Sequence, residues 1–400
     1  MKNLTAQEAR QRILAKARVM GTQWVSPDQA YGRVLAEPVV AQRDQPPFRA
    51  SAMDGYAVRV FDALDHPAKL QVIGESAAGM AFRGSVPAGN AVRIFTGAPV
   101  PSDCDHVVIQ ENVQRDGAMA HLGPLKGQGA NIRAQGGDFR AGEVLLETGA
   151  RLDAWRLSLA ASAGAGSLAV IQRPRVAVLS TGNELVEPGQ TPSLDQIFNS
   201  GSPAVCALLD SWGAQAICLH SAVDDAEAIA VAVRDLDVDL IVTLGGASVG
   251  DHDLVKPAMA LLGLELLVET IALRPGKPTW FGTLGDGRLI LGLPGNPASA
   301  LVCAELFLRP LVNAMLGLEA GPLMETAQLA TPLPSNGPRE HWMRAKLENR
   351  QGTIVAAPFR DQDSSLISVF AQADALVCQP AQCGGLEAGS PVQILRLNRL

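Results

Sequence analysis

Aromatic residues are scarce in this chain, at 4% of 400 residues, whereas Gly (39) and Pro (26) are plentiful. This mixture argues against long helical bundles and favours many short strands and tight loops. The net charge is −7 and no basic stripe with interleaved aromatics is present, so nucleic-acid binding is not expected. The N-terminus lacks the apolar segment of a secretory signal, and no apolar run is long enough to span a bilayer. We therefore expect a cytoplasmic protein without membrane contact.

Zinc-type cysteine pairs are also missing. The six cysteines form no CxxC pair and have no histidine at zinc-ligand spacing. We expect them to be buried or incidental reduced thiols. The chain is too long for one hydrophobic core, and its 47% hydrophobic and 18% charged residues are typical of a folded, soluble protein. Two to four domains are expected.

The first 173 residues alternate between helical and β patterns. Residues 5–20 predict a helix, because Thr5 can cap it and Glu8 follows three residues later. A second short helix is expected over residues 27–34 and a third over residues 153–163. Between them, short β segments separated by glycine occupy residues 70–149 and predict a mainly β module.

Residues 174–316 have a different rhythm, in which buried apolar strands alternate with amphipathic helices. This pattern predicts a parallel α/β sheet, and ligands of such sheets bind outside the carboxyl ends of the strands. The stretch 317–334 is rich in Gly, Pro and Thr and is predicted to be a linker. The remaining residues to 400 predict a small β domain from short strands.

Two loops of the α/β region follow directly after strands. In Ser180–Leu185 (STGNEL), Thr181 with its hydroxyl, a turn glycine and the carboxylate of Glu184 suit phosphate or metal binding, although a turn with a solvated Glu184 explains the same pattern. In Thr243–Asp253 (TLGGASVGDHD), the glycines let the backbone approach a ligand and Ser248 adds a hydroxyl. Asp253 is a candidate Mg²⁺ ligand, whereas a helix N-cap is the alternative for Asp253 and, with equal weight to a functional role, for Asp251.

Two further loops carry cations or free backbone N–H groups. Arg274 and Lys277 lie on the proline-stiffened loop RPGKP and make a candidate oxyanion cradle. In LPGNPAS, Pro294 and Pro297 precede a helix, and Ser299 follows close behind. An ordinary proline-initiated helix is the alternative. None of these loops matches a Walker A or GxGxxG motif, so ordinary NTPase and nicotinamide chemistry are not supported.

Taken together, the motifs resemble the molybdopterin molybdenumtransferase family, which includes bacterial MoeA proteins and the gephyrin E domain. The matching segments run in family order: PPFRASAMDGYAV (46–58), RIFTGAPVPSDCDHVVIQE (93–111), GANIRAQGGDFRAGEVLLETGARL (129–152), VAVLSTGNELVEPG (176–189), TLGGASVGDHDLVKPAM (243–259), RPGKPTWFG (274–282) and GLPGNPASALVCAELFLRPLV (292–312). The chain departs from the family at DSSLIS (363–368), where a serine-glycine turn is typical.

The resemblance implies a multidomain fold of α/β plus β type. Its central parallel α/β domain, expected over residues 174–318, resembles molybdopterin adenylyltransferase. An elongated discontinuous N-terminal domain is expected over 1–44 plus 140–173, an inserted β-rich domain over 45–139 and a C-terminal β-barrel over 325–400. The implied assembly is a homodimer, with each active site shared between the α/β domain of one subunit and the inserted domain of the other.

The resemblance also implies an activity: Mg²⁺-dependent insertion of molybdate into adenylylated molybdopterin, with release of AMP, to form molybdenum cofactor. The adenylyltransferase and recipient molybdoenzymes are the transient partners that the resemblance implies. The implied catalytic residues are Asp54, Asp138, Glu184 and Asp253. The implied Mg²⁺ ligands are Glu184, Asp224, Asp225 and Asp253. The expected molybdate and pterin-phosphate contacts are Thr96, Thr181, Ser248, Arg274, Lys277, Pro294, Pro297 and Ser299.

Two rival functions remain open. The chain can be an adenylyltransferase acting on molybdopterin itself, but the segments around MDGYA and IFTGAPVP are foreign to that enzyme type. A non-enzymatic scaffold is the second rival, although it has no need to keep the whole acidic set. For Asp54, a simple turn with Gly55 at positive φ is the structural alternative to a catalytic role.

Overall fold

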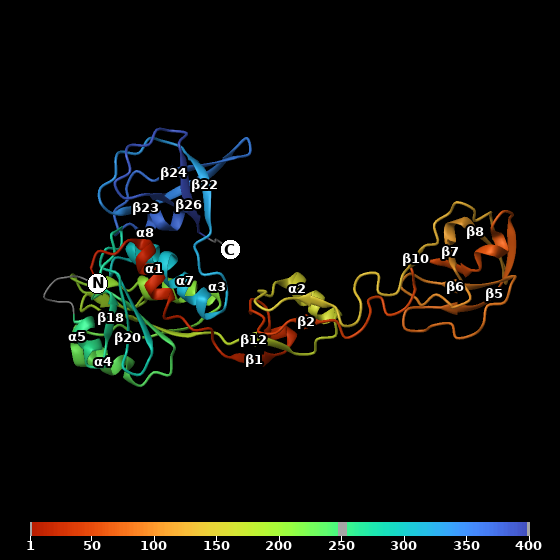
Figure 1. Cartoon of the computed structure of the whole chain (residues 1–400), viewed down its shortest axis with the longest axis horizontal. Helices are drawn as coiled ribbons and strands as arrows, with labels where there is room; N and C mark the ends of the chain where they lie inside the picture. Colours follow the sequence, from red (N-terminus) through yellow and green to blue (C-terminus); the bar gives the residue numbers. More distant parts are fainter. Residues whose placement is uncertain (1, 247–253, 398–400) are drawn as a thin grey trace. The chain divides into compact units, whose positions relative to one another are not determined.

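The computed structural model describes residues 2–246 and 254–397 of the chain. They form two compact units (Figure 1). One contains Met1–Gln23 and Ile171–Leu400, and the other contains Trp24–Val170. Within the first unit lie an α/β domain and a C-terminal β domain. The second unit is mainly β.

A six-stranded sheet forms the centre of the α/β domain, in the order β16-β13-β17-β21-β20-β18. The bounds are β13 Arg175–Ser180, β16 Gln215–Cys218, β17 Leu240–Leu244, β18 Glu265–Val268, β20 Trp280–Thr283 and β21 Leu289–Leu293. The four strands from β16 to β21 run parallel, as predicted, whereas β20 runs antiparallel to both of its neighbours, β21 and β18. Strand β20 was not predicted from the sequence. The turn between β20 and β21 is too short for a crossover helix, so these two strands form a hairpin.

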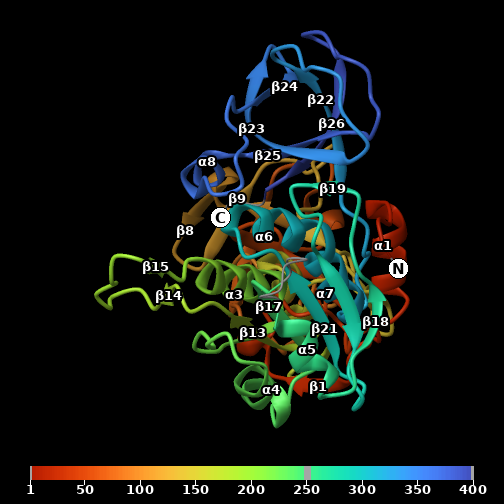
Figure 2. The same cartoon turned by 90° about the vertical axis from the view of Figure 1, so that its left-hand side faces the viewer.

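Helices cover this sheet (Figure 2). They are α3 (Gly201–Trp212), α4 (Ala226–Arg234), α5 (Val255–Ala260), α6 (Pro297–Cys303) and α7 (Arg309–Met315). A π-helical segment, Ala304–Leu308, joins α6 to α7. The combined helix over residues 297–315 is long and apolar enough to cross a membrane, but 83% of its apolar window is buried inside the protein. Such burial is typical of the core helix of a globular domain.

Helix α1 (Ala6–Leu14) begins with the capping box that the sequence predicts, since Thr5 and Glu8 hydrogen-bond to each other's backbone amides. Its neighbours are α7 and β18 of the α/β domain. The backbone of Leu4 also bonds to Thr270 and Ala272. The first 23 residues therefore group with the α/β unit, whereas the family resemblance implies an elongated domain that includes residues 1–44. Long-range packing of α1, which no local pattern reveals, accounts for the difference.

The C-terminal domain is a closed barrel, as predicted. Its strands are β22 (Met324–Leu329), β23 (Glu340–Arg350), β24 (Thr353–Pro358), β25 (Ala375–Gln379) and β26 (Pro391–Arg396). They pair in the ring β23-β24-β22-β26-β25, and β25 closes it on β23. One short strand of the α/β domain, β19 (Leu273–Arg274), adds to the edge of β23. Helix α8 (Ile367–Gln372) lies between β24 and β25 in the chain and contacts α6.

The second unit has a six-stranded sheet in the order β7-β4-β6-β5-β9-β8. Its strands are β4 Gly55–Val58, β5 Ala68–Ser76, β6 Asn90–Ile94, β7 His106–Ile109, β8 Val113–Asp116 and β9 Met119–Leu122. Three two-stranded pairs complete the unit: β1 (Thr22–Val25) with β12 (Leu168–Ile171), β2 (Val39–Val40) with β11 (Val144–Leu146), and β3 (Ala50–Ser51) with β10 (Ile132–Arg133).

Helix α2 (Ala154–Ser162) follows in this unit and is capped by Asp153, in agreement with the prediction. The expected helix over residues 27–34 is wrong, because only a single 3₁₀ turn forms at Pro27–Gln29. Gly32 adopts φ +73°, outside the helical region, and Leu35 bridges to Val170 instead of continuing a helix.

The expectation of reduced thiols is wrong for one pair of cysteines. Cys206 on α3 and Cys218 at the end of β16 form a disulfide, with their Cα atoms 6.3 Å apart. The other four cysteines are free. Spacing alone does not predict this pair, because α3 returns the chain to the sheet before β16 and thereby brings the two residues together.

Candidate active site

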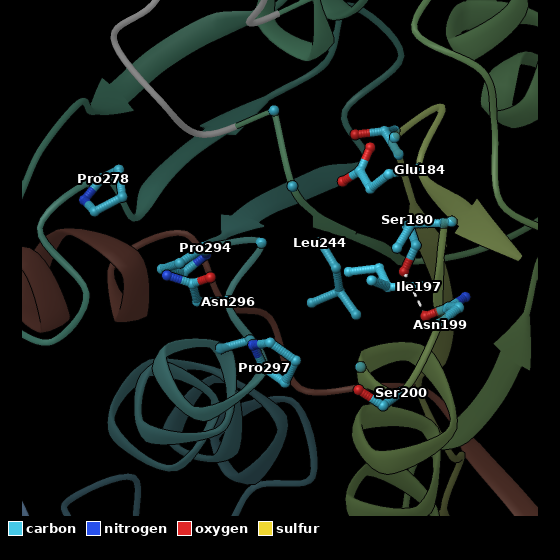
Figure 3. Close-up of a pocket in the computed structure, with 18 of the residues that line it drawn as sticks. Ser180, Glu184, Ile197, Asn199, Ser200, Leu244, Pro278, Pro294, Asn296 and Pro297 are labelled. Atoms are coloured by element: carbon cyan, nitrogen blue, oxygen red, sulfur yellow. Dashed lines mark hydrogen bonds between the residues drawn. The ribbon is translucent and has the colours of Figure 1, made fainter. Parts of the chain in front are cut away.

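A pocket of about 740 Å³ opens beyond the carboxyl ends of the parallel strands β13, β17 and β21 (Figure 3). This is where the strand pattern predicts a ligand to bind. The lining residues come from five segments of the α/β domain and are largely polar or proline. They include Ser180, Thr181, Gly182, Glu184, Leu185, Ile197, Phe198, Asn199, Ser200, Asp224, Leu244, Gly245, Thr270, Lys277, Pro278, Pro294, Gly295, Asn296 and Pro297.

Close backbone approach shapes the floor of the pocket. Gly245, directly after β17, has φ +96°, and a Cβ added there would lie 2.7 Å from the carbonyl oxygen of Thr181. Only glycine fits, because both the left-handed conformation and the close contact exclude a side chain. The close approach at Gly245 is thus between two strand-end loops of the protein itself.

The Thr181 side chain is buried in this floor, with 5% of its surface exposed. Within the described residues its Oγ1 has no hydrogen-bond partner. A buried hydroxyl without a partner is costly in a folded protein. Because Thr181 lines the pocket, a bound ligand can supply the missing bond.

Two carboxylates line the pocket. Glu184 folds back over Gly182, which has φ +151° and where an added Cβ would meet the Glu184 carboxylate. Asp224 accepts a 3.2 Å hydrogen bond from the backbone N–H of Asn183, while the Asn183 side chain accepts one from the N–H of Asp224. The third predicted metal ligand of the described region, Asp225, instead caps helix α4 through the N–H of Ala228 at 2.8 Å.

The two cations of the RPGKP loop have separate surroundings. Lys277 lines the pocket and forms no salt bridge among the residues that the structure describes. Arg274 is exposed, does not line the pocket and pairs in β19 with His341 of the barrel. Burial first, and then the charges of Arg274, Arg339 and Arg344, together lower the pKa of His341 to about 4. Ser299 is buried within α6 and also lies outside the pocket lining.

Asn296 connects the pocket to the C-terminal barrel. It precedes α6 but its side chain does not cap that helix. Instead its Nδ2 donates a 2.9 Å hydrogen bond to Oγ of Ser364. Pro294 and Pro297 flank it and line the pocket (Figure 3). Asn296 was not among the residues predicted from the sequence, although an Asn between two prolines at a strand end is an available signal.

The predicted residues of the inserted region lie in the second unit. Asp54 precedes β4, and its Oδ1 accepts hydrogen bonds from both the N–H (2.7 Å) and the Oγ1 (2.8 Å) of Thr96. The backbone bond and then the hydroxyl bond lower the pKa of Asp54. Asp54 is therefore a partly exposed carboxylate that Thr96 holds in place. Asp138 is exposed in the same unit, and its backbone N–H bonds to Gln45.

Three candidate residues of the TLGGASVGDHD loop have no described position. Ser248, Asp251 and Asp253 lie outside the described residues. Several lining residues that the sequence analysis missed come from the segment between β13 and α3, among them Ile197, Phe198 and Asn199. Polar and apolar residues alternate irregularly in this segment, so its sequence shows neither the helical nor the strand periodicity that would have predicted its position.

Three family models match the chain in order. They describe the MoeA N-terminal region, domains I and II (residues 4–164), a probable molybdopterin binding domain (residues 177–314) and the MoeA C-terminal region, domain IV (residues 326–397). A molybdopterin molybdenumtransferase of Haemophilus influenzae is 34% identical over 99% of this chain and 99% of its own length. One of Bacillus subtilis is 32% identical over 97% and 93%.

Among solved structures, a molybdopterin biosynthesis MoeA protein from Pyrococcus horikosii superposes with a TM-score of 0.85 at 30% identity, covering 100% of both chains. The α/β domain with its strand-end pocket, the β-rich second unit and the closed barrel thus define a protein of MoeA architecture. The chain belongs to the molybdopterin molybdenumtransferase family, and it is a transferase of molybdenum cofactor biosynthesis. The resemblance and the fold class predicted from the motifs are confirmed.

Proposed function

We propose that this enzyme inserts molybdate into adenylylated molybdopterin and releases AMP. The observation that carries the proposal is the strand-end pocket, which combines two carboxylates, the buried Thr181 hydroxyl and one lysine that forms no salt bridge within residues 2–246 and 254–397. A phosphorylated substrate and a tetrahedral oxyanion both need several converging donors. Thr181 and Lys277 supply donors, and the strand-end glycines keep the backbone accessible.

The residues present fit a magnesium ion. Among residues 2–246 and 254–397 no group of three metal-ligating side chains occurs. Glu184 and Asp224, however, line the pocket, and Mg²⁺ is commonly held by one or two carboxylates while substrate phosphates and water complete its shell. Glu184 and Asp224 would hold it. When bound, Mg²⁺ would screen the phosphate charge and polarise the phosphorus–oxygen bonds.

The chain's own residues orient the substrate in this proposal. The Lys277 ammonium group attracts the oxyanion. The Thr181 hydroxyl donates a hydrogen bond to a phosphate or molybdate oxygen. Asn296 offers its carboxamide between Pro294 and Pro297, where the rigid loop limits its movement. Arg274 and Ser299 do not line the pocket, so we propose no direct contact between either residue and the substrate.

The proposal includes a homodimer that acts in the cytoplasm. Its support is that the expected site residues divide between the two units: Asp54, Thr96 and Asp138 fall in one, and the pocket residues fall in the other. A site shared between subunits requires such a division. Contacts with the adenylyltransferase and with recipient molybdoenzymes extend the proposal, because a reactive pterin benefits from direct transfer.

Active-site complementation tests the dimer. Asp54→Ala and Glu184→Ala proteins would be mixed and allowed to exchange subunits. A shared site predicts that each heterodimer keeps one intact site, so the mixture regains about a quarter of wild-type activity. Mixtures that stay inactive after demonstrated exchange contradict sharing.

The reaction itself is tested by AMP release from purified adenylylated molybdopterin, with and without molybdate and with and without Mg²⁺. Molybdate-dependent release by the wild type, lost in Glu184→Ala, supports the proposal. Tight binding without turnover would favour a scaffold. Transfer of AMP from ATP to free molybdopterin would favour an adenylyltransferase.

A further inference from the structure

Residues 185–199, which we call the pocket loop, form one wall of the pocket. The short strands β14 (Leu185–Val186) and β15 (Ile197–Phe198) pair in parallel at its base. Leu185, Ile197 and Phe198 line the pocket, yet Ile197 is 60% and Phe198 48% exposed. Apolar packing therefore does not fix the position of Ile197 and Phe198. Hydrogen bonds at the base of the pocket loop fix it instead.

Glu187 supplies these contacts from one atom. Its Oε1 accepts from the backbone N–H of Ser221 (3.2 Å), from Oγ of Ser221 (2.8 Å) and from Nδ2 of Asn199 (3.5 Å). Partial burial alone would raise the pKa of Glu187, but the bonds from Ser221 and Asn199 outweigh it and the pKa lies below its usual value. The carboxylate thus ties the pocket loop to the segment between β16 and α4.

Asn199 passes this restraint to the pocket. Only 2% of its surface is exposed. Its Oδ1 accepts from Oγ of Ser180 (3.1 Å) and from the N–H of Ser202 (3.2 Å), and its Nδ2 also donates to Oγ of Ser221 (3.1 Å). Ser180 and Asn199 both line the pocket (Figure 3). A buried carboxamide with donors and acceptors satisfied on both sides has one orientation.

We propose that Glu187 is a positioning residue, which fixes Asn199 and the apolar wall of the pocket loop in the arrangement that binds the substrate. This inference rests on the proposed function, since it assigns the pocket to the adenylylated pterin. Glu187 does not line the pocket, so it acts through Asn199 and Ser221.

Because all three hydrogen bonds end on Oε1 of Glu187, two variants can separate the loss of these bonds from the loss of the charge. Glu187→Gln keeps a carbonyl oxygen at the position of Oε1 and therefore keeps all three bonds, whereas Glu187→Leu keeps the size and loses them. We expect Glu187→Leu to raise KM for adenylylated molybdopterin about tenfold, equivalent to about 1.4 kcal/mol. Its kcat should change by less than about twofold, because the reacting groups stay in place. Glu187→Gln should restore a KM near that of the wild type. Asp195→Leu, an exposed acid of the same loop, is the matched control.

A second readout does not depend on turnover. Hydrogen exchange of peptides that contain Asn199 and Ser221 should accelerate in Glu187→Leu but not in Glu187→Gln or Asp195→Leu. An unchanged KM and unchanged exchange in Glu187→Leu would overturn the inference, as would equal losses in the Gln and Leu variants. Absence of AMP release by the wild type would instead overturn the proposed function, and the exchange data would still decide the role of Glu187.

Discussion

The carboxamide of Asn296 in the pocket and the hydroxyl of Ser364 in the C-terminal domain are joined by a hydrogen bond of 2.9 Å. Ser364, which accepts this bond, lies in a segment that Arg344 binds on both sides. The nearly fully buried guanidinium of Arg344 donates to Oε1 of Gln362 and to the carbonyl oxygens of Asp363 and Leu366. Through this segment the barrel contributes to the pocket of the α/β domain.

Ser364→Ala should therefore loosen Asn296 without disturbing the barrel. We expect KM for adenylylated molybdopterin to rise about three- to tenfold, because one hydrogen bond is worth about 1 kcal/mol. The melting temperature should change little, since Arg344 bonds to backbone carbonyls and to Gln362. Steady-state AMP release and calorimetry measure the two quantities. Ser368→Ala in α8 is the control, and equal KM values in both variants would contradict the role of Ser364.

Thr96→Val should raise the pKa of Asp54. Thr96 donates to Asp54 from its N–H and its hydroxyl, and valine removes only the second bond. A carboxyl with a lowered pKa stays ionised to lower pH, so the acid limb of the pH–rate profile should move to higher pH in the variant. Thr96→Ser keeps the hydroxyl and should leave the limb in place. An unmoved limb in Thr96→Val would show that Asp54 does not control it.

Local signals explain which elements could be predicted. The capping box of Thr5 and Glu8 lies within one helical turn, and β13 and β17 are continuous apolar runs buried in the sheet. Their prediction needs no knowledge of distant contacts. Strand β20 was missed because its antiparallel pairing with β21 depends on a tight turn inside an otherwise alternating α/β pattern.

Long-range contacts explain what the sequence could not show. The bonds from Asn199 and Ser221 to Glu187 span 12 and 34 residues, and the bond from Asn296 to Ser364 spans 68. Residue type indicates a capacity for hydrogen bonding but not the partner. Arg274 illustrates the same limit: its charge beside Lys277 suggested a joint cradle, whereas β19 carries it to the edge of the barrel.

Gly55→Ala should destabilise the six-stranded sheet of the second unit. Gly55 lies in β4 between β6 and β7, and a Cβ there would collide with the backbone carbonyl oxygen of Val108. Backbone cannot move aside as a flexible side chain does, so we expect a loss of about 1–3 kcal/mol. Chemical denaturation followed by circular dichroism measures it. Gly123→Ala, where no atom lies within 4 Å, is the control, and equal stability of the two variants would contradict the collision.

His341 should make stability fall in mildly acidic solution. Burial, followed by the charges of Arg274, Arg339 and Arg344, lowers its pKa to about 4 in the folded state, against 6.5 for the ordinary side chain. Between these values the unfolded chain binds a proton that the folded protein does not, so the free energy of unfolding decreases as pH falls from about 6.5 to about 4. The full difference corresponds to about 3 kcal/mol.

His341→Gln cannot titrate and should remove this part of the pH dependence. Urea denaturation at a series of pH values would compare the slopes of wild type and variant, with His66→Gln, an exposed histidine of the second unit, as the control. The wild type and the control should lose stability in parallel, while His341→Gln follows a shallower curve. Parallel curves for all three proteins would mean that His341 is protonated alike in the folded and unfolded states, and that its burial beside three arginines has no effect on its charge.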